Sequence, residues 1–128
     1  DDNTFLRGFL GRMLFSGDEV NKPVNVLSGG EKVRVMLSKL MLLKSNVLVL
    51  DDPTNHLDLE SISSLNDGLK NFKESIIFAS HDHEFIQTLA NHIIVLSKNR
   101  VIDRIDETYD EFLGNAEVQA KVKELWKD

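Results

Sequence analysis

The chain has 128 residues and an ordinary composition, enough for one globular domain with a modest hydrophobic core. It has no cysteine, which excludes disulfides and thiolate metal sites, and no apolar stretch of the roughly 18–20 residues that span a bilayer. The net charge of −6 indicates no basic surface for nucleic acid, which argues against RNA binding by this chain alone.

The first residues, Asp-Asp-Asn, include neither an initiator methionine nor a basic leader, and we expect an internal piece of a longer protein. Apolar residues at helical spacing then predict a first helix with a core-facing stripe; they are Phe5, Leu6, Phe9, Leu10, Met13 and Leu14. Residues 16–18 read as a turn, and residues 18–22 predict a short helix that ends before Pro23.

The next stretch, residues 27–31, combines a helix cap with two glycines. Ser28 and Glu31 fit a capping box ahead of an apolar run, so a helix is predicted to start near Gly29. The free amides of a helix start favour an anion, and Gly29 and Gly30 would let a phosphate approach the backbone. A capped helix with a flexible entry is the alternative.

Residues 47–50 form an apolar run that predicts a strand buried on both faces of a parallel sheet. The strand ends in Asp51 and Asp52, and Pro53 cannot continue it. Ligands of open α/β sheets bind beyond the carboxyl ends of the strands, where two acids can hold a divalent cation or orient a water. An acidic turn after a core strand is the alternative.

Two later helices have predicted caps. Asp58 precedes a helix whose apolar face comprises Ile62, Leu65 and Leu69. Asp82 precedes another, with Phe85, Ile86 and Leu89. On the helix that starts near Gly29, Arg34 and Lys39 are expected on the solvated face.

Two further strands are predicted, over residues 76–79 and 93–96, with Val101–Ile105 as a hairpin partner of the latter. Right-handed crossovers would place all three apolar strands in one parallel sheet, with the acid pair and His81 at a common edge. The imidazole of His81 can hydrogen-bond a phosphate oxygen near neutral pH, although a lone histidine after a strand is usually structural. Short helices are predicted near 109–113 and over 117–126.

Four motifs, in order and spacing, resemble those of ATP-binding-cassette (ABC) ATPases. Residues 27–31 (LSGGE) are similar to the signature motif, 47–52 to the Walker B strand and 55–58 (NHLD) to the D-loop, and His81 stands at the switch histidine. The wording SGGEK and PTNHLD most resembles the ABC-F subfamily, soluble tandem-cassette ATPases that act on ribosomes. The resemblance covers roughly residues 5–113.

The resemblance implies an α/β fold: a partial P-loop NTPase cassette, with a parallel sheet core, flanking helices and part of the helical subdomain. The sequence contains no G-x-x-x-x-G-K-[ST] and no Q-loop, so it looks like the C-terminal part of one cassette. Residues 1–46 would be part of the helical subdomain, 47–114 part of the catalytic core, and 115–128 a C-terminal helical tail.

The resemblance also implies roles at the strand ends. Asp51 matches the Walker B aspartate that helps hold Mg²⁺. Asp52 stands where the family usually has a glutamate that positions the attacking water, and its side chain is one methylene shorter, so we expect slow hydrolysis. His81 would contact the γ-phosphate of ATP and sense its loss.

The signature residues would serve a different nucleotide. Ser28, Gly29 and Gly30, with Glu31 in the same motif, would meet the γ-phosphate of an ATP held by the opposite cassette. Asp58 would lie at the cassette interface and couple the two sites, a role compatible with a helix cap.

The sequence therefore predicts the ATP- and Mg²⁺-binding ATPase cassette of a cytoplasmic ABC-F protein. Its partners would be a second nucleotide-binding domain of the same chain, the ribosome and tRNA, with no direct membrane insertion. The alternatives are the ATP-binding subunit of a membrane transporter and a non-catalytic interaction module. The isolated 128 residues are expected to bind ATP weakly and to turn over none.

Overall fold

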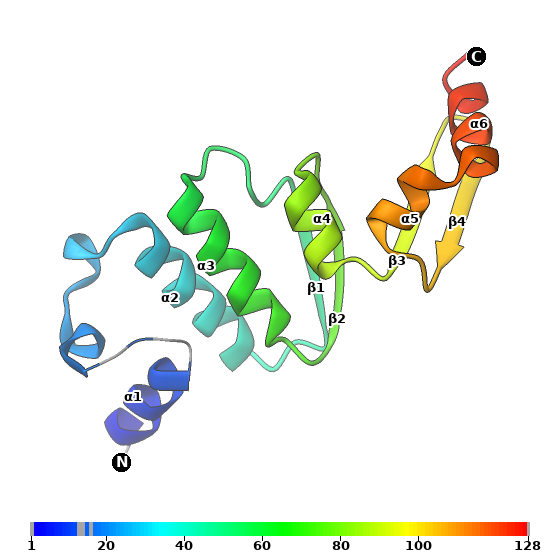
Figure 1. Cartoon of the computed structure of the whole chain (residues 1–128). Helices are drawn as coiled ribbons and strands as arrows, with labels where there is room; N and C mark the ends of the chain where they lie inside the picture. Colours follow the sequence, from blue (N-terminus) through cyan, green and yellow to red (C-terminus); the bar gives the residue numbers. More distant parts are fainter. Residues whose placement is uncertain (1, 13–14, 16, 128) are drawn as a thin grey trace. The chain divides into compact units, whose positions relative to one another are not determined.

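A computed structural model describes residues 2–12, 15 and 17–127, so Met13, Leu14 and Ser16 of the predicted first helix and turn lie outside the described residues. The chain divides into two compact units, Asp1–His81 and Asp82–Asp128 (Figure 1). Over the described residues, none of the helices combines the length and apolarity that crossing a membrane requires. The predicted segments 1–46, 47–114 and 115–128 stay a prediction.

The first unit is mixed α/β. In chain order it contains α1 (Asp2–Arg12), the 3-10 helices η1 (Gly17–Asn21) and η2 (Val24–Val26), α2 (Gly29–Leu42), β1 (Val47–Asp51), α3 (Leu59–Lys70) and β2 (Ser75–Ala79). The short helix predicted before Pro23 forms as η1. The mixture of a small parallel sheet with flanking helices agrees with the predicted α/β class and with a partial cassette.

The strands β1 and β2 are parallel and pair in register from Val47 opposite Ser75 to Asp51 opposite Ala79. Successive side chains of a strand point to opposite faces. Leu48 is buried, whereas Val49 is 74% exposed and its partner Ile77 is 62% exposed. The prediction that β1 is buried on both faces is therefore wrong for the described chain, because its elements cover one face only.

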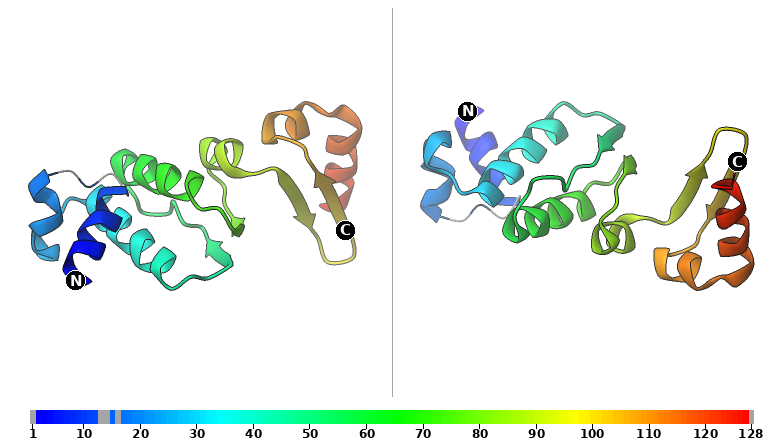
Figure 2. Two further views of the ribbon diagram at one scale, coloured as in Figure 1. Left: turned by 90° about the horizontal axis from the view of Figure 1, so that it is seen from below. Right: turned by 90° about the horizontal axis from the view of Figure 1, so that it is seen from above.

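The core of the first unit lies between α2, α3 and the covered face of the sheet. The helices α2 and α3 pack side by side in every view (Figures 1 and 2). The buried apolar side chains here include Val33, Leu37, Leu48, Leu65 and Leu69. On α2 the buried residues Val33 and Leu37 lie four positions apart, and so do Leu65 and Leu69 on α3. The apolar face predicted for α3 is confirmed at Leu65 and Leu69, whereas Ile62 is half-buried.

The second unit contains α4 (His83–Leu89), β3 (His92–Leu96), β4 (Val101–Ile105), α5 (Tyr109–Gly114) and α6 (Ala116–Leu125). The strands β3 and β4 form an antiparallel hairpin as a separate two-stranded sheet. The prediction of a third parallel strand is therefore wrong. A tight turn, with a hydrogen bond from the Ser97 amide to the Arg100 carbonyl at 3.0 Å, turns β4 back onto β3.

Helices α5 and α6 complete this unit over a small core of Phe85, Phe112, Val118 and Leu125. Tyr109 stacks on Phe112 with ring centroids 6.1 Å apart.

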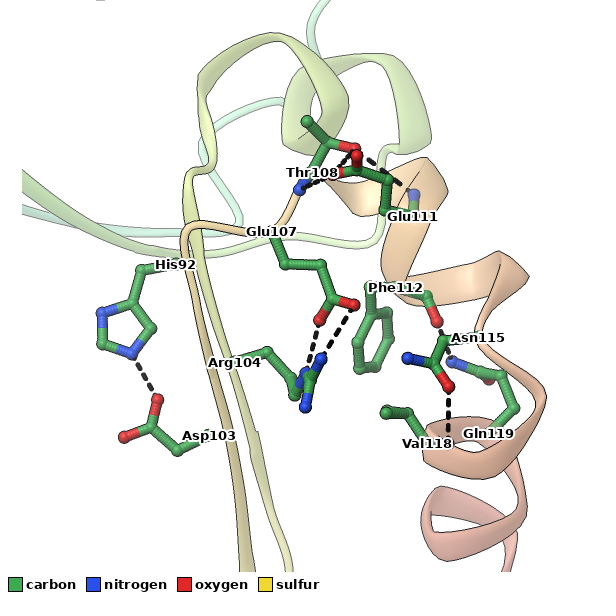
Figure 3. A network of polar contacts seen from close by, with 10 residues as sticks. All are labelled: His92, Asp103, Arg104, Glu107, Thr108, Glu111, Phe112, Asn115, Val118 and Gln119. Atoms are coloured by element: carbon green, nitrogen blue, oxygen red, sulfur yellow. Dashed lines mark hydrogen bonds and ion pairs between the residues drawn. The ribbon is translucent and has the colours of Figure 1, made fainter.

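A chain of polar contacts fixes the connection from β4 to the two helices (Figure 3). Arg104 donates two hydrogen bonds to Glu107, at 2.6 and 3.2 Å, which raises the pKa of the guanidinium and lowers that of the carboxyl. Thr108 and Glu111 form a capping box at the start of α5, and Asn115 caps α6.

Candidate functional site

The first turn of α2 is held by a capping box and an ion pair. Ser28 Oγ accepts a hydrogen bond from the Glu31 amide at 3.2 Å, and Glu31 Oε2 accepts one from the Ser28 amide at 2.6 Å. Lys22 Nζ lies 3.1 Å from Glu31 Oε1. The Ser28 N–H first, and then Lys22, lower the pKa of the buried Glu31 carboxyl, which therefore stays ionised at neutral pH.

The two glycines of this turn lie where α2 meets the start of α3. A Cβ atom at Gly29 would stand 2.8 Å from Ser61 Oγ, and one at Gly30 would stand 2.8 Å from Ser64 Oγ. Both separations are too short for a carbon–oxygen contact, so a side chain at either position would force the serine hydroxyls or the helices to shift. The predicted approach of a phosphate to these glycines stays a prediction, and their packing role was not predicted from the sequence.

The start of α3 carries the predicted interface residue. Asp58 Oδ1 accepts a hydrogen bond from the Ser61 amide at 2.8 Å, so the predicted helix cap is confirmed. The Ser61 hydroxyl and amide lower the pKa of the Asp58 carboxyl. Ser28 Oγ also donates to Glu60 Oε1 at 3.3 Å, which joins the N-termini of α2 and α3 directly.

The acid pair and the histidine follow the carboxyl ends of two hydrogen-bonded parallel strands. Asp51 ends β1, and the Asp52 amide donates to the Ala79 carbonyl, the end of β2, at 2.9 Å. His81 comes two residues after Ala79. Asp51, Asp52 and His81 thus follow the carboxyl ends of the strands at one edge of the parallel sheet, which consists of two strands and not the predicted three. Asp52 has a positive φ of 42° and its carbonyl accepts from the Asn55 amide at 3.0 Å, which turns the chain sharply away from β1.

Asp51 and Asp52 are exposed carboxylates, and carboxylate oxygens are the ligands that Mg²⁺ prefers. Mg²⁺ usually keeps several waters and is bound through one or two carboxylates plus substrate phosphates. The pair therefore fits a Mg²⁺ ion that is shared with a phosphate. Within residues 2–12, 15 and 17–127, no group of three or more histidines, cysteines or acids could hold a metal by itself.

The predicted residues fall into two groups. The helix-end group comprises Ser28, Gly29, Gly30, Glu31 and Asp58; the strand-edge group comprises Asp51, Asp52 and His81. Among the residues that the structure describes, no hydrogen bond or ion pair joins one group to the other. The roles predicted for the residues of both groups stay predictions.

One charged residue is not where the sequence predicted it. Arg34 was expected on the solvated face, but its Nη1 donates to Ser64 Oγ at 3.0 Å and its guanidinium lies 5.3 Å from the centre of the Phe15 ring. Lys39 is exposed, as expected. The sequence signal for the close contact of α2 with α3 is the pair Ser61 and Ser64, two small residues three positions apart on α3.

A family model described as "ABC transporter" matches residues 4–55. The chain is 62% identical, over 98% of its length, to the "Uncharacterized ABC transporter ATP-binding protein YkpA" of Bacillus subtilis, of which it covers 23%. It is 37% identical, over 96% of its length, to "ABC transporter F family member 2" of Arabidopsis thaliana, of which it covers 18%.

A third relative is "ATP-binding cassette sub-family F member 3" of Rattus norvegicus, 38% identical over 80% of this chain and 14% of the relative. The chain thus spans less than a quarter of each of these relatives. The family model's match covers Asp51, Asp52 and every member of the helix-end group except Asp58, whereas Asp58 and His81 lie beyond it.

Proposed function

The chain belongs to the ABC family of ATP-binding proteins, with relatives in its F subfamily, and on that premise we propose that it forms part of an ATP-hydrolysing cassette. The observation that carries this proposal is the strand edge, where the amide of Asp52 is bonded to the end of β2 and brings the acid pair next to the segment leading to His81. Such an edge is where α/β sheets bind their ligands.

Each strand-edge residue has a distinct proposed task. Asp51 would hold Mg²⁺, which when bound neutralises charge on the phosphates of ATP. The Asp52 carboxylate would accept a hydrogen bond from the attacking water and orient it toward the γ-phosphate. The His81 imidazole would hydrogen-bond a γ-phosphate oxygen and so distinguish ATP from ADP.

The helix-end group would act on a second ATP, held by another cassette of the same protein. The amides at the start of α2 and the hydroxyl of Ser28 are donors suited to a phosphate. Asp58 at the start of the adjacent α3 would face the same partner cassette. Binding of two ATP molecules would then close the cassettes, and hydrolysis would release them.

The test of ATPase function uses the full-length protein that contains this chain. Asp52→Asn and His81→Ala are each expected to lower the rate of ATP hydrolysis by at least about a hundredfold, while ATP binding persists. Asp52→Asn removes the carboxylate that orients the water, and His81→Ala removes the hydrogen bond to the γ-phosphate. Glu74→Gln, an exposed glutamate in the loop before β2, is the matched control. A rate of ATP hydrolysis equal to that of the wild type in both variants would contradict the proposed roles.

We further propose that the full-length protein is a cytoplasmic ABC-F ATPase that acts on the ribosome and tRNA in translation. The support is the presence of the SGGEK and PTNHLD motifs and the names of the F-subfamily relatives. The Asp52→Asn protein with ATP should co-sediment with ribosomes, and the wild type with ADP should not. Absence of ATP-dependent sedimentation, together with co-purification of a transmembrane subunit, would favour the transporter alternative instead.

A further inference from the structure

Glu60 lies between the two helix starts. It belongs to the first turn of α3, and its Oε1 accepts the hydrogen bond from Ser28 Oγ at 3.3 Å. The same oxygen would be 3.1 Å from a Cβ atom at Gly30, so the carboxylate lies against the first turn of α2. Among the described residues, Glu60 forms no ion pair that would neutralise it.

The hydroxyl of Ser28 is fully committed in this arrangement. A serine hydroxyl has one hydrogen to donate and an oxygen that can accept. The oxygen accepts from the Glu31 amide, and the hydrogen goes to Glu60. A phosphate oxygen that accepts a hydrogen bond from the Ser28 hydroxyl must therefore displace the Glu60 carboxylate as its acceptor.

Charge works in the same direction. The positive end of the α2 dipole attracts anions, and the carboxylates of Glu31, Asp58 and Glu60 already lie at this turn, with Glu60 hydrogen-bonded to the Ser28 hydroxyl. The nearby ammonium of Lys22 is engaged by Glu31. An incoming phosphate consequently meets an uncompensated negative charge a few ångströms from its donor groups.

We propose that Glu60 is a positioning residue that holds the Ser28 hydroxyl and competes with the γ-phosphate of ATP for it. This proposal rests on the proposed function of the helix-end group. On this proposal Glu60 raises the ATP concentration at which the cassettes close, because its carboxylate must give up its hydrogen bond to Ser28 before the phosphate can bind.

The test measures ATP hydrolysis and ADP inhibition in the full-length protein carrying Glu60→Gln. Glutamine keeps an oxygen acceptor and the packing of Glu60 but removes its charge, so KM for ATP should fall about two- to fivefold, the usual worth of one charge near a helix N-terminus. The kcat should stay unchanged, and so should ADP inhibition, since ADP has no γ-phosphate. Glu74→Gln, with the same loss of charge elsewhere in the first unit, should leave KM unchanged.

Two further variants separate the possible outcomes. In a Ser28→Ala background the hydroxyl is gone, and the effect of Glu60→Gln on KM should shrink. If Ser28→Ala weakens ATP use but Glu60→Gln leaves KM unchanged or raises it, the competition is overturned and the proposed function stands. If neither substitution alters KM, the proposed role of the helix-end group fails, and the competition fails with it.

Discussion

The carboxylate of Glu31 is almost enclosed and receives hydrogen bonds from the Ser28 amide and the Lys22 ammonium. These contacts keep its pKa in the folded protein below the ordinary value of 4.5. The unfolded chain therefore takes up the proton first as the pH falls, and folding loses this contribution. The stabilisation is fully present above about pH 4.5 and disappears as the pH drops through the lower folded pKa.

We accordingly expect Glu31→Gln to lower the melting temperature at pH 7, because the charge-assisted bonds are weakened. The gap from wild type should close as the pH falls through the lowered pKa of the folded protein, where the wild-type carboxyl becomes protonated too. Thermal unfolding followed by circular dichroism over a pH series measures this. Glu74→Gln should show no comparable gap, and curves for Glu31→Gln that run parallel to wild type at all pH values would rule the explanation out.

Asp52 combines a short side chain with an unusual backbone. Its φ of 42° is left-handed, a region that aspartate tolerates better than glutamate does. On the proposed function, Asp52→Glu would extend the carboxylate toward the water and raise the turnover of the full-length protein, by up to about a hundredfold. It should also cost about 1 kcal/mol of stability through backbone strain. Steady-state kinetics paired with a thermal melt measures both; an unchanged or slower turnover would count against the proposed position of Asp52.

Among the elements, α2 and α3 depend on small side chains where they touch. Gly29 and Gly30 face Ser61 and Ser64, and Ser64 in turn accepts the hydrogen bond of Arg34. Buried serine hydroxyls on a packed helix have little room to retreat. The first turn of α2 is therefore fixed by its neighbour as much as by its own capping box.

A Gly30→Ala substitution is expected to destabilise the first unit by about 1–3 kcal/mol, as overpacking does elsewhere. Gly8→Ala is the contrasting control: nothing lies within 4 Å of a Cβ there, so the helix propensity of alanine should add up to about 1 kcal/mol. Urea unfolding of both variants, followed by circular dichroism, measures whether each substitution lowers or raises the free energy of unfolding. Adding Ser64→Ala to Gly30→Ala should recover part of the loss, and a Gly30→Ala protein as stable as wild type would show that the helices can move apart freely.

The elements that the sequence predicted correctly are those fixed by local interactions. The caps at Ser28, Asp58 and Asp82 each bond an amide three residues ahead, so they are visible in a short window of sequence. The hairpin of β3 and β4 was likewise predicted from its short turn, whereas the pairing of β3 with a distant parallel strand was predicted wrongly, because long-range pairing is not encoded in a short window of sequence. The contacts of Arg34 with Ser64 and Phe15 were not predicted for a similar reason, because these partners come from other parts of the chain.

Across the whole chain, each unit presents an uncovered apolar sheet face. In the first unit this face includes Val47, Val49 and Ile77. In the second it includes Ile94, Leu96, Val101 and Ile105, together with the exposed His92–Asp103 pair on the same face. Exposed apolar sheet surface promotes association in water, and the face of the first unit has no ion pair among the described residues to oppose it.

The isolated 128-residue chain is therefore expected to self-associate, and Val49→Lys should weaken that association by about tenfold, the worth of one buried apolar side chain. Sedimentation velocity over a range of concentrations measures it. Leu59→Lys provides the matched control, since Leu59 is 86% exposed on α3 and lies outside both sheet faces. Equal effects of the two substitutions, or a chain that stays monomeric throughout, would refute the role of the sheet face.

The division at His81 also governs what optical spectroscopy can detect. The chain has one tryptophan and one tyrosine, Trp126 and Tyr109, and both belong to the unit Asp82–Asp128. Intrinsic fluorescence therefore follows the melting of that unit and is blind to the unit that carries Ser28, Asp51 and Asp52. Denaturation curves recorded by emission and by far-ultraviolet ellipticity should coincide only if the two units unfold together, and a tryptophan introduced at Phe72 would give the first unit a reporter of its own.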